Sequence, residues 1–268
     1  AAGIVSTDGT RLFVQRATGL VQDVFTTAVL EKLPGDRAIG HVRYSTAGGS
    51  HLKNAQPIAV DMKYGSIGVG HNGNLTNADA LRAELEAQGS IFQTTSDTEV
   101  VVHLIARSTA ESGTDRIAEA LRRVEGAFSM LFLTKDELIA VRDPWGFRPL
   151  CLGRTAEGAW VVSSEPPAFE LIAARYERDV EPGEMVVITE YGLRSMRPFD
   201  PKPTRACIFE HVYFARPDSK LFGSSVYAAR KEMGRILADE SAVGADVVIP
   251  VPDSGVSAEL GYGERAKV

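Results

Sequence analysis

The order of the predicted elements indicates an α+β fold. Short strands with alternating apolar residues dominate the first 70 residues, helical patterns follow between residues 78 and 124, and short strands return after residue 127. Strands, then helices, then strands again differ from the regular strand–helix alternation of a parallel α/β fold. The Pro-rich stretch 198–203 is typical of a linker, so a second part of the chain is expected after it.

Local signals place the elements in order. The helix 78–88 has Asn77 as a candidate N-cap and Gly89 as its stop, and Ser96 and Glu99 have capping-box spacing at the start of the helix 97–107. The other helices are predicted over residues 21–33, 115–124 and 225–240, and the strands over residues 3–6, 12–15, 38–44, 58–61, 66–70, 127–133, 138–142, 149–152, 160–163, 185–189 and 246–251. The last helix and strand are typical of the start of a parallel α/β domain, where ligand loops follow strand ends.

Composition excludes several classes of protein. A chain of 268 residues with 44% hydrophobic residues can build one large or two modest domains. The net charge of −6 argues against a nucleic-acid partner, and no apolar run is long enough to span a membrane. Two distant cysteines favour a reducing, cytoplasmic compartment over a disulfide framework.

The segment Gly70-His71-Asn72-Gly73-Asn74 follows a predicted strand and carries two adjacent donors. The amide of Asn72 and the backbone N–H of Gly73 could form an oxyanion hole, which stabilises negative charge on an attacked carbonyl. On this motif alone, an Asn-Gly hairpin turn is the favoured interpretation.

Two charged residues strengthen the first interpretation. Arg43, in the motif GHVRYST at residues 40–46, is either a surface ion-pair residue or a bidentate clamp for a carboxylate. Asp97, in TTSDTE at residues 94–99, is explained by the helix dipole or by binding an ammonium group. A cation, an anion and an oxyanion-type pair together suit an amino acid with a reactive side-chain carbonyl.

These motifs, with RDPWGFRPL at 142–150, SSE at 163–165 and FARPDS at 214–219, resemble the glutamine phosphoribosylpyrophosphate amidotransferases. That family belongs to the class II amidotransferases, which have an N-terminal nucleophile. FARPDS and VPDSG at 251–255 point to the phosphoribosyl branch. The resemblance runs from residue 1 to about Gly261, and whether residues 261–268 are contiguous with the rest stays open.

The resemblance implies a four-layer αββα glutaminase domain over residues 1–203 and an incomplete type I phosphoribosyltransferase domain over residues 204–268. Glutamine would be hydrolysed in the first, and its ammonia transferred to phosphoribosyl pyrophosphate in the second, giving 5-phosphoribosylamine for purine synthesis. Arg43 would bind the α-carboxylate of glutamine, Asp97 its α-ammonium group, and Asn72 with Gly73 the oxyanion. Asp253, Ser254 and Gly255 are equally well explained as a pyrophosphate loop or as a plain turn. Arg142 and Asp143 are expected to be structural.

The family nucleophile, a cysteine at the mature N-terminus, has no counterpart here. The chain is therefore expected to be an internal piece, truncated at both ends and without glutaminase activity of its own. Core packing is favoured for Cys151 and Cys207. Cys207 nevertheless falls at an iron–sulfur ligand position of some family members, which leaves a cluster undecided. Mg²⁺ is expected as a cofactor with ligands outside this chain.

The resemblance also implies partners. Glutamine and phosphoribosyl pyrophosphate would be substrates, purine nucleotides would be feedback inhibitors, and the protein would form a homo-oligomer. Two alternatives stay open: a degenerate, non-catalytic relative that binds amino acids or scaffolds a complex, and another class II enzyme such as a stand-alone glutaminase or a sugar-phosphate amidotransferase. FARPDS and VPDSG count against the latter.

Overall fold

The structure is a computed structural model that describes residues 1–43 and 51–268. Its internal contacts define two compact units. The first comprises Ala1–Phe147 and Val180–Thr204, and the second comprises Arg148–Asp179 and Arg205–Val268. The segment 148–179 thus contacts the C-terminal part of the chain, which the sequence pattern did not indicate. The division into domains 1–203 and 204–268 stays a prediction.

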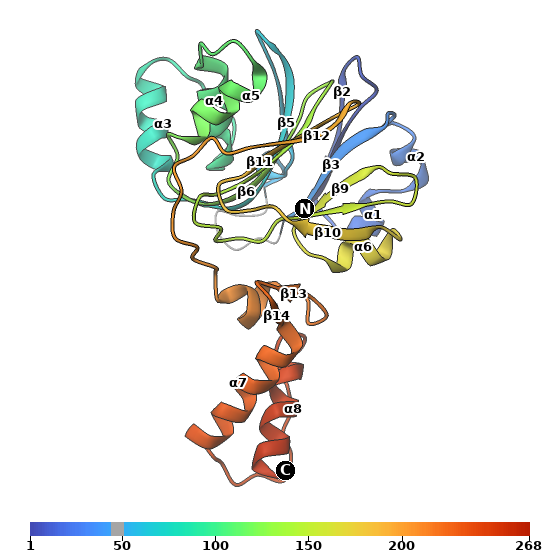
Figure 1. Ribbon diagram of the computed structural model, residues 1–268, viewed down its shortest axis with the longest axis vertical. Helices are drawn as coiled ribbons and strands as arrows, with labels where there is room; N and C mark the ends of the chain where they lie inside the picture. The colour runs from blue at the N-terminus through green and yellow to red at the C-terminus, as the bar shows by residue number, and fades with distance from the viewer. Residues whose placement is uncertain (44–50) are drawn as a thin grey trace. The chain divides into compact units, whose positions relative to one another are not determined.

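The first unit is built on a six-stranded antiparallel sheet with the order β12-β11-β7-β6-β5-β4 (Figure 1). The long strand β5 is next to the edge strand β4, which pairs with it only as far as Val69. Beyond Val69, one side of β5 therefore has no neighbouring strand in the described part of this sheet. The strands are β4 (Ile58–Met62), β5 (Gly65–Leu75), β6 (Gly126–Leu133), β7 (Leu138–Arg142), β11 (Met185–Thr189) and β12 (Gly192–Met196).

Each face of this sheet has its own cover. The helices α3 (Ala78–Ala87), α4 (Thr98–Arg107) and α5 (Gly113–Leu121) bury Leu85, Val101 and Ile117 against one face. A second sheet with the order β2-β1-β3 packs Val5 and Ile39 against Leu133 on the other face. Its strands are β1 (Ala2–Thr7), β2 (Leu12–Ala17) and β3 (Arg37–Val42). This unit therefore has a mixed α/β architecture in which β3 and β5 lie in adjacent layers.

The second unit contains a small sheet with the order β10-β8-β9 and a pair of packed helices. The helices α7 (Val226–Glu240) and α8 (Gly255–Ala266) approach closely at Gly234, where a Cβ atom would lie 1.8 Å from the backbone oxygen of Ala258. Only glycine permits this spacing. The remaining elements are β8 (Cys151–Arg154), β9 (Trp160–Ser163), α6 (Pro167–Leu171), β10 (Arg175–Asp179), the π-helix η2 (Glu210–Phe214), β13 (Lys220–Leu221) and β14 (Ser224–Ser225).

Two predicted elements are wrong. The single helix over 21–33 is instead two one-turn helices, α1 (Val21–Val24) and α2 (Thr27–Leu30), because Phe25 and Thr26 leave the helical conformation and only Val24 is buried. The predicted strand 246–251 has neither helix nor strand structure, and Ile249 is 81% exposed. A strand needs a paired neighbour, and no described segment pairs with it. The elements α6, β10 and β12 were not predicted.

No helix among the described residues is both long and apolar enough to cross a lipid bilayer.

Candidate functional site

The HNGN motif lies inside strand β5 and not in a turn. β5 continues to Leu75 and pairs with β6, with Asn72 opposite Ser129 and Gly73 opposite Phe128. The hairpin interpretation is therefore wrong, as is the prediction that the strand ends at Gly70. Gly73 is what lets the strand continue, because a Cβ atom there would lie 2.0 Å from the backbone oxygen of Ala127.

The N–H groups of alternate β5 residues point to the edge of the strand beyond β4. The His71 N–H donates to Gln56 Oε1 at 2.7 Å, and the Leu75 N–H donates to Asp97 Oδ2 at 2.9 Å. Neighbouring residues of a strand direct their backbone groups to opposite sides, so Gly73 directs its N–H to this same edge. The backbone groups of Phe128, opposite Gly73, bond Asp143 on the β7 side, which agrees with this direction.

Two histidines lie close to Asn72, one on β3 and one next to it on β5. His41, on β3, places Nε2 3.1 Å from Asn72 Oδ1 and 3.0 Å from the backbone oxygen of His71. The side chain of His71 faces the helix layer, where Nδ1 lies 3.1 Å from Thr98 Oγ1. Asn72 is thus held from the β3 side, while His71 joins β5 to the start of α4.

Asp97 is held as an anion beside β5. Burial acts to raise the pKa of Asp97, but the nearby imidazole of His71 and the N–H groups of Leu75 and Thr98 outweigh it and lower the pKa to about 2. The distance from His71 Nδ1 to Asp97 Oδ1 is 3.7 Å. In α4 the carboxylate contacts the adjacent Thr98, whose Oγ1 lies 3.3 Å from Oδ1, and it makes no capping bond further along the helix. Its bond from the Leu75 N–H is shorter, so the helix-dipole explanation omits its main contact, which is with β5.

The predicted capping box is also wrong in detail. Ser96 Oγ accepts from the N–H of Thr98 at 3.3 Å. Glu99 accepts from the N–H groups of Gln93 and Thr94 at 2.8 and 2.7 Å, instead of reaching back to Ser96. Both side chains therefore shape the loop that carries Asp97.

Arg43 is connected to this loop through Asn54. Its Nη1 donates to the backbone oxygen of Asn54 at 3.1 Å. The buried Asn54 side chain donates to Thr95 Oγ1 at 2.9 Å and accepts from the Thr95 N–H at 3.0 Å. Arg43 and Asp97 therefore belong to one hydrogen-bonded assembly with β5. The residues Tyr44, Ser45 and Thr46 of the same motif lie outside the described residues.

The structure thus joins the segments that carry Arg43, Asn72, Gly73 and Asp97. It adds residues to which sequence reasoning gave no role: Asn54, His41, His71, Gln56 and Thr98. Both histidines belong to the motifs that identified the site. Their nearness in the sequence to Arg43 and Asn72 was the signal that could have marked them as site residues. No such signal marked Asn54 or Gln56, because their contacts depend on the packing of the two sheets.

The acidity of Asp97 predicts a pH-dependent contribution to stability. A carboxyl group whose pKa is lowered on folding stabilises the protein above the unfolded pKa, near 4, and loses that contribution as the pH falls toward 2. The contribution should be about 2 kcal/mol above pH 5, with roughly half of it lost by pH 3. Urea unfolding of wild type and Asp97→Asn at pH 6 and pH 3 should show a smaller difference at pH 3. Asp36→Asn, at an exposed carboxylate, is the control. If the difference in free energy of unfolding between wild type and Asp97→Asn were the same at both pH values, the assignment would be contradicted.

Arg142 and Asp143 have the structural role predicted for them. Arg142 donates to the backbone oxygens of Val180 and Gly146, at 2.8 and 3.0 Å. Asp143 accepts from the N–H of Trp145 at 2.9 Å, and burial raises the pKa of this carboxyl group. Both side chains fix the turn after β7.

The predicted pyrophosphate residues belong to the second unit, where Asp253 and Ser254 lie in a turn and Gly255 is the first residue of α8. The N–H of Gly255 donates to the backbone oxygen of Val251 at 3.0 Å, which closes the turn. Cys151 is buried, and its thiol donates to the backbone oxygen of Ser163 at 3.2 Å, as expected for a core residue. Cys207 is only partly buried.

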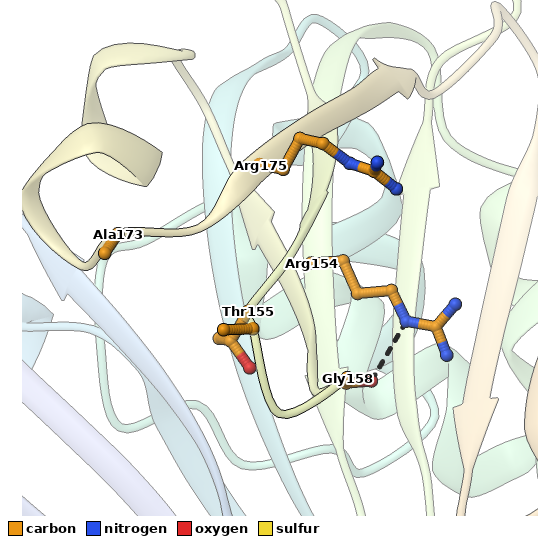
Figure 2. Close-up of a pocket in the computed structure, with 6 residues that line it drawn as sticks. Arg154, Thr155, Gly158, Ala173 and Arg175 are labelled. Carbon is orange, nitrogen blue, oxygen red and sulfur yellow. Dashed lines mark hydrogen bonds between the residues drawn. The ribbon is translucent and has the colours of Figure 1, made fainter.

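A cavity of about 510 Å³ in the second unit is lined by Arg154, Thr155 and Arg175, among others (Figure 2). Its cations are already engaged. Arg154 donates to the backbone oxygen of Gly158 at 3.1 Å, and Arg175 pairs with Glu177 at 2.6 Å. The cavity contains none of the predicted site residues.

Three comparisons show which known proteins this chain is similar to. A family model described as a glutamine amidotransferase domain matches residues 41–171, a range that includes Arg43, Asn72, Gly73 and Asp97. Amidophosphoribosyltransferase 1, chloroplastic, of Arabidopsis thaliana is 54% identical over 272 residues, which cover 100% of this chain and 47% of the relative. The amidophosphoribosyltransferase of Bacillus subtilis is 49% identical over 269 residues, covering 100% of this chain and 56% of the relative.

Over its whole length the chain is similar to members of the amidophosphoribosyltransferase family. It spans about half the length of the curated relatives that it matches.

Solved structures of the family share its fold. The glutamine phosphoribosylpyrophosphate amidotransferase of B. subtilis, complexed with ADP and GMP, matches with a TM-score of 0.91 and 46% identity, covering 100% of this chain and 58% of that one. A structure described as the allosteric regulatory enzyme of purine biosynthesis matches with a TM-score of 0.93 and 47% identity. The match covers 100% of this chain and 57% of that one. The mixed α/β fold is therefore that of solved amidophosphoribosyltransferases.

Proposed function

We propose that the protein containing this chain transfers ammonia from glutamine to phosphoribosyl pyrophosphate and thereby forms 5-phosphoribosylamine. The first unit supplies the glutamine site. The observation that carries this proposal is that two potential oxyanion donors on β5 lie beside a carboxylate with a lowered pKa, whose loop is joined through Asn54 to the Arg43 guanidinium.

Each group has a chemical role in this proposal. Arg43 binds the α-carboxylate of glutamine with its planar fork, and Asp97 binds the α-ammonium group. As a thiolate attacks the carboxamide carbon, the negative charge on the amide oxygen is stabilised by the Asn72 amide and the Gly73 N–H. Ammonia leaves the tetrahedral intermediate, and water then releases glutamate from the thioester.

The second half-reaction is assigned to the phosphoribosyltransferase domain that residues 204–268 begin. In it, Asp253, Ser254 and Gly255 at the start of α8 face the pyrophosphate group, because helix N-termini favour anions. The four-layer αββα arrangement belongs to the same proposal, and its support is the two stacked sheets with helices on one face. A homo-oligomeric state, feedback by purine nucleotides and a cytoplasmic location are proposed on family resemblance alone.

The cofactors have no ligand set among the described residues. No group of three or more His, Cys, Asp or Glu side chains in this part of the chain could hold a metal ion, and Cys207 has no partner thiol in it. No step above passes through an iron–sulfur cluster or Mg²⁺, and Mg²⁺ stays a prediction with its ligands outside this chain.

Arg43→Lys in the full-length protein tests the carboxylate clamp. Lysine keeps the charge but loses the bidentate contact, so kcat/KM for glutamine should fall by a factor equivalent to about 1.5–3 kcal/mol. Synthesis from added ammonia should continue. The control is Arg37→Lys, at the start of the strand β3 that Arg43 follows. Arg37 Nη1 donates to the backbone oxygen of Lys135 at 3.1 Å, and the glutamine kinetics of this variant should be unchanged. An equal loss of both activities in Arg43→Lys would show that Arg43 supports the fold and does not bind substrate.

A further inference from the structure

We infer that His41 is the positioning residue that orients Asn72 as an oxyanion donor. The inference rests on the proposed glutamine reaction and on the contacts of one ring nitrogen. His41 Nε2 lies within hydrogen-bond distance of two oxygens, the His71 backbone oxygen at 3.0 Å and Asn72 Oδ1 at 3.1 Å.

The His71 oxygen determines the tautomer of His41. A backbone carbonyl can only accept a hydrogen bond, so His41 Nε2 must carry its hydrogen to bond it. Burial lowers the pKa of His41, against the opposing effect of its hydrogen bonds to His71 and Asn72, and keeps the ring neutral near pH 7. A neutral ring with hydrogen on Nε2 has a bare Nδ1, and His41 Nδ1 is buried without a hydrogen-bond partner among the described residues.

The tautomer in turn determines the orientation of the Asn72 amide. If the amide were reversed, its NH₂ group would face the Nε2–H of His41, and two donors would be placed against each other. The observed orientation directs the oxygen to His41 and leaves both amide hydrogens on the opposite side. Those hydrogens are the ones that an oxyanion beside the Gly73 N–H requires.

A pair of amide substitutions in the full-length protein tests the inference. Glutamine is long enough to place an N–H donor near the position of His41 Nε2, whereas asparagine is too short. His41→Asn should lower kcat for glutamate release by about tenfold with little change in KM, and His41→Gln should restore most of the loss. A role confined to packing would lower thermal stability without this separation of kcat from KM.

A double-mutant cycle identifies the route of the effect. If His41 acts through Asn72, His41→Asn should change kcat by less than about twofold in the Asn72→Ala background. If His41→Asn lowered kcat in the Asn72→Ala background by the same factor as in the wild type, the inference would be overturned and the proposed function would stand. If Asn72→Ala alone leaves kcat unchanged, the proposed function fails and the inference fails with it.

The tautomer can also be measured in the wild-type protein, which does not depend on whether a variant folds. Proton–nitrogen correlation spectra of protein with ¹⁵N-labelled histidine should show His41 as neutral with hydrogen on Nε2, assigned by the signal that is lost in His41→Gln. A neutral His41 with hydrogen on Nδ1 would overturn the inference, because Nε2 could then donate to neither oxygen.

Discussion

Asn72→Ala should lower kcat for glutamine hydrolysis by the full-length protein by roughly 10²–10³, with a much smaller change in KM. The reason is that a full negative charge on the amide oxygen exists only in the tetrahedral intermediate and its transition states. The substrate itself is held by Arg43 and Asp97. Steady-state glutamate release at several glutamine concentrations separates the two constants.

Asn72→Asp is the matched control for the hydrogen bond with His41. Aspartate keeps an oxygen that accepts from His41 Nε2, whereas alanine leaves this donor without its side-chain acceptor. Both variants should lose kcat, but Asn72→Asp should retain more of the melting temperature. If Asn72→Ala shifted the melting temperature and left glutamine kinetics unchanged, Asn72 would be a structural residue of β5 and not an oxyanion donor.

Gly73→Ala should have the largest effect on stability. The new Cβ atom would lie 2.0 Å from the Ala127 oxygen and 2.7 Å from His71 Nε2, and the φ angle of +151° is strained for alanine. Because the nearest atom belongs to the backbone of β6, the two strands must separate, at a cost of about 2–4 kcal/mol. Hydrogen–deuterium exchange should show faster exchange along β5 and β6.

Gly70→Ala is the control in the same strand, because a Cβ atom at Gly70 would meet nothing within 4 Å. It should leave exchange in β5 and β6 almost unchanged. If Gly70→Ala and Gly73→Ala accelerated hydrogen exchange equally, β5 would tolerate a side chain at neither position. The close approach of Gly73 to Ala127 would then not be the cause of the faster exchange in Gly73→Ala.

Local sequence signals were sufficient for elements whose own residues determine them. The helix α3 ends at Ala87, one residue before its predicted end, and Gly89 stops it as predicted, because the N–H of Gly89 bonds back to Glu86 at a φ of +86°. Ser225 caps α7 through the N–H of Ala228 at 3.3 Å. Such signals failed at β5, where Asn-Gly is typical of a turn but pairing with β6 over eight residue pairs keeps the chain extended.

The candidate site was predicted only as a set of residue types. Charge and donor chemistry identified Arg43, Asn72, Gly73 and Asp97, but their connections depend on contacts between distant segments. The bond from the Leu75 N–H to Asp97 spans 22 residues, and that from Asn54 to Thr95 spans 41. Neither bond follows from local pattern, because each requires the packing of a loop against a sheet.

The most direct test of the glutamine site is a crystal structure of the full-length protein with bound glutamate. Glutamate should place its α-carboxylate on the Arg43 guanidinium and its α-ammonium group on Asp97. One oxygen of its side-chain carboxylate should lie about 2.7–3.2 Å from both Asn72 Nδ2 and the Gly73 nitrogen. Glutamate bound in the reverse orientation, or at a place that none of these residues reaches, would contradict the assignment of the site.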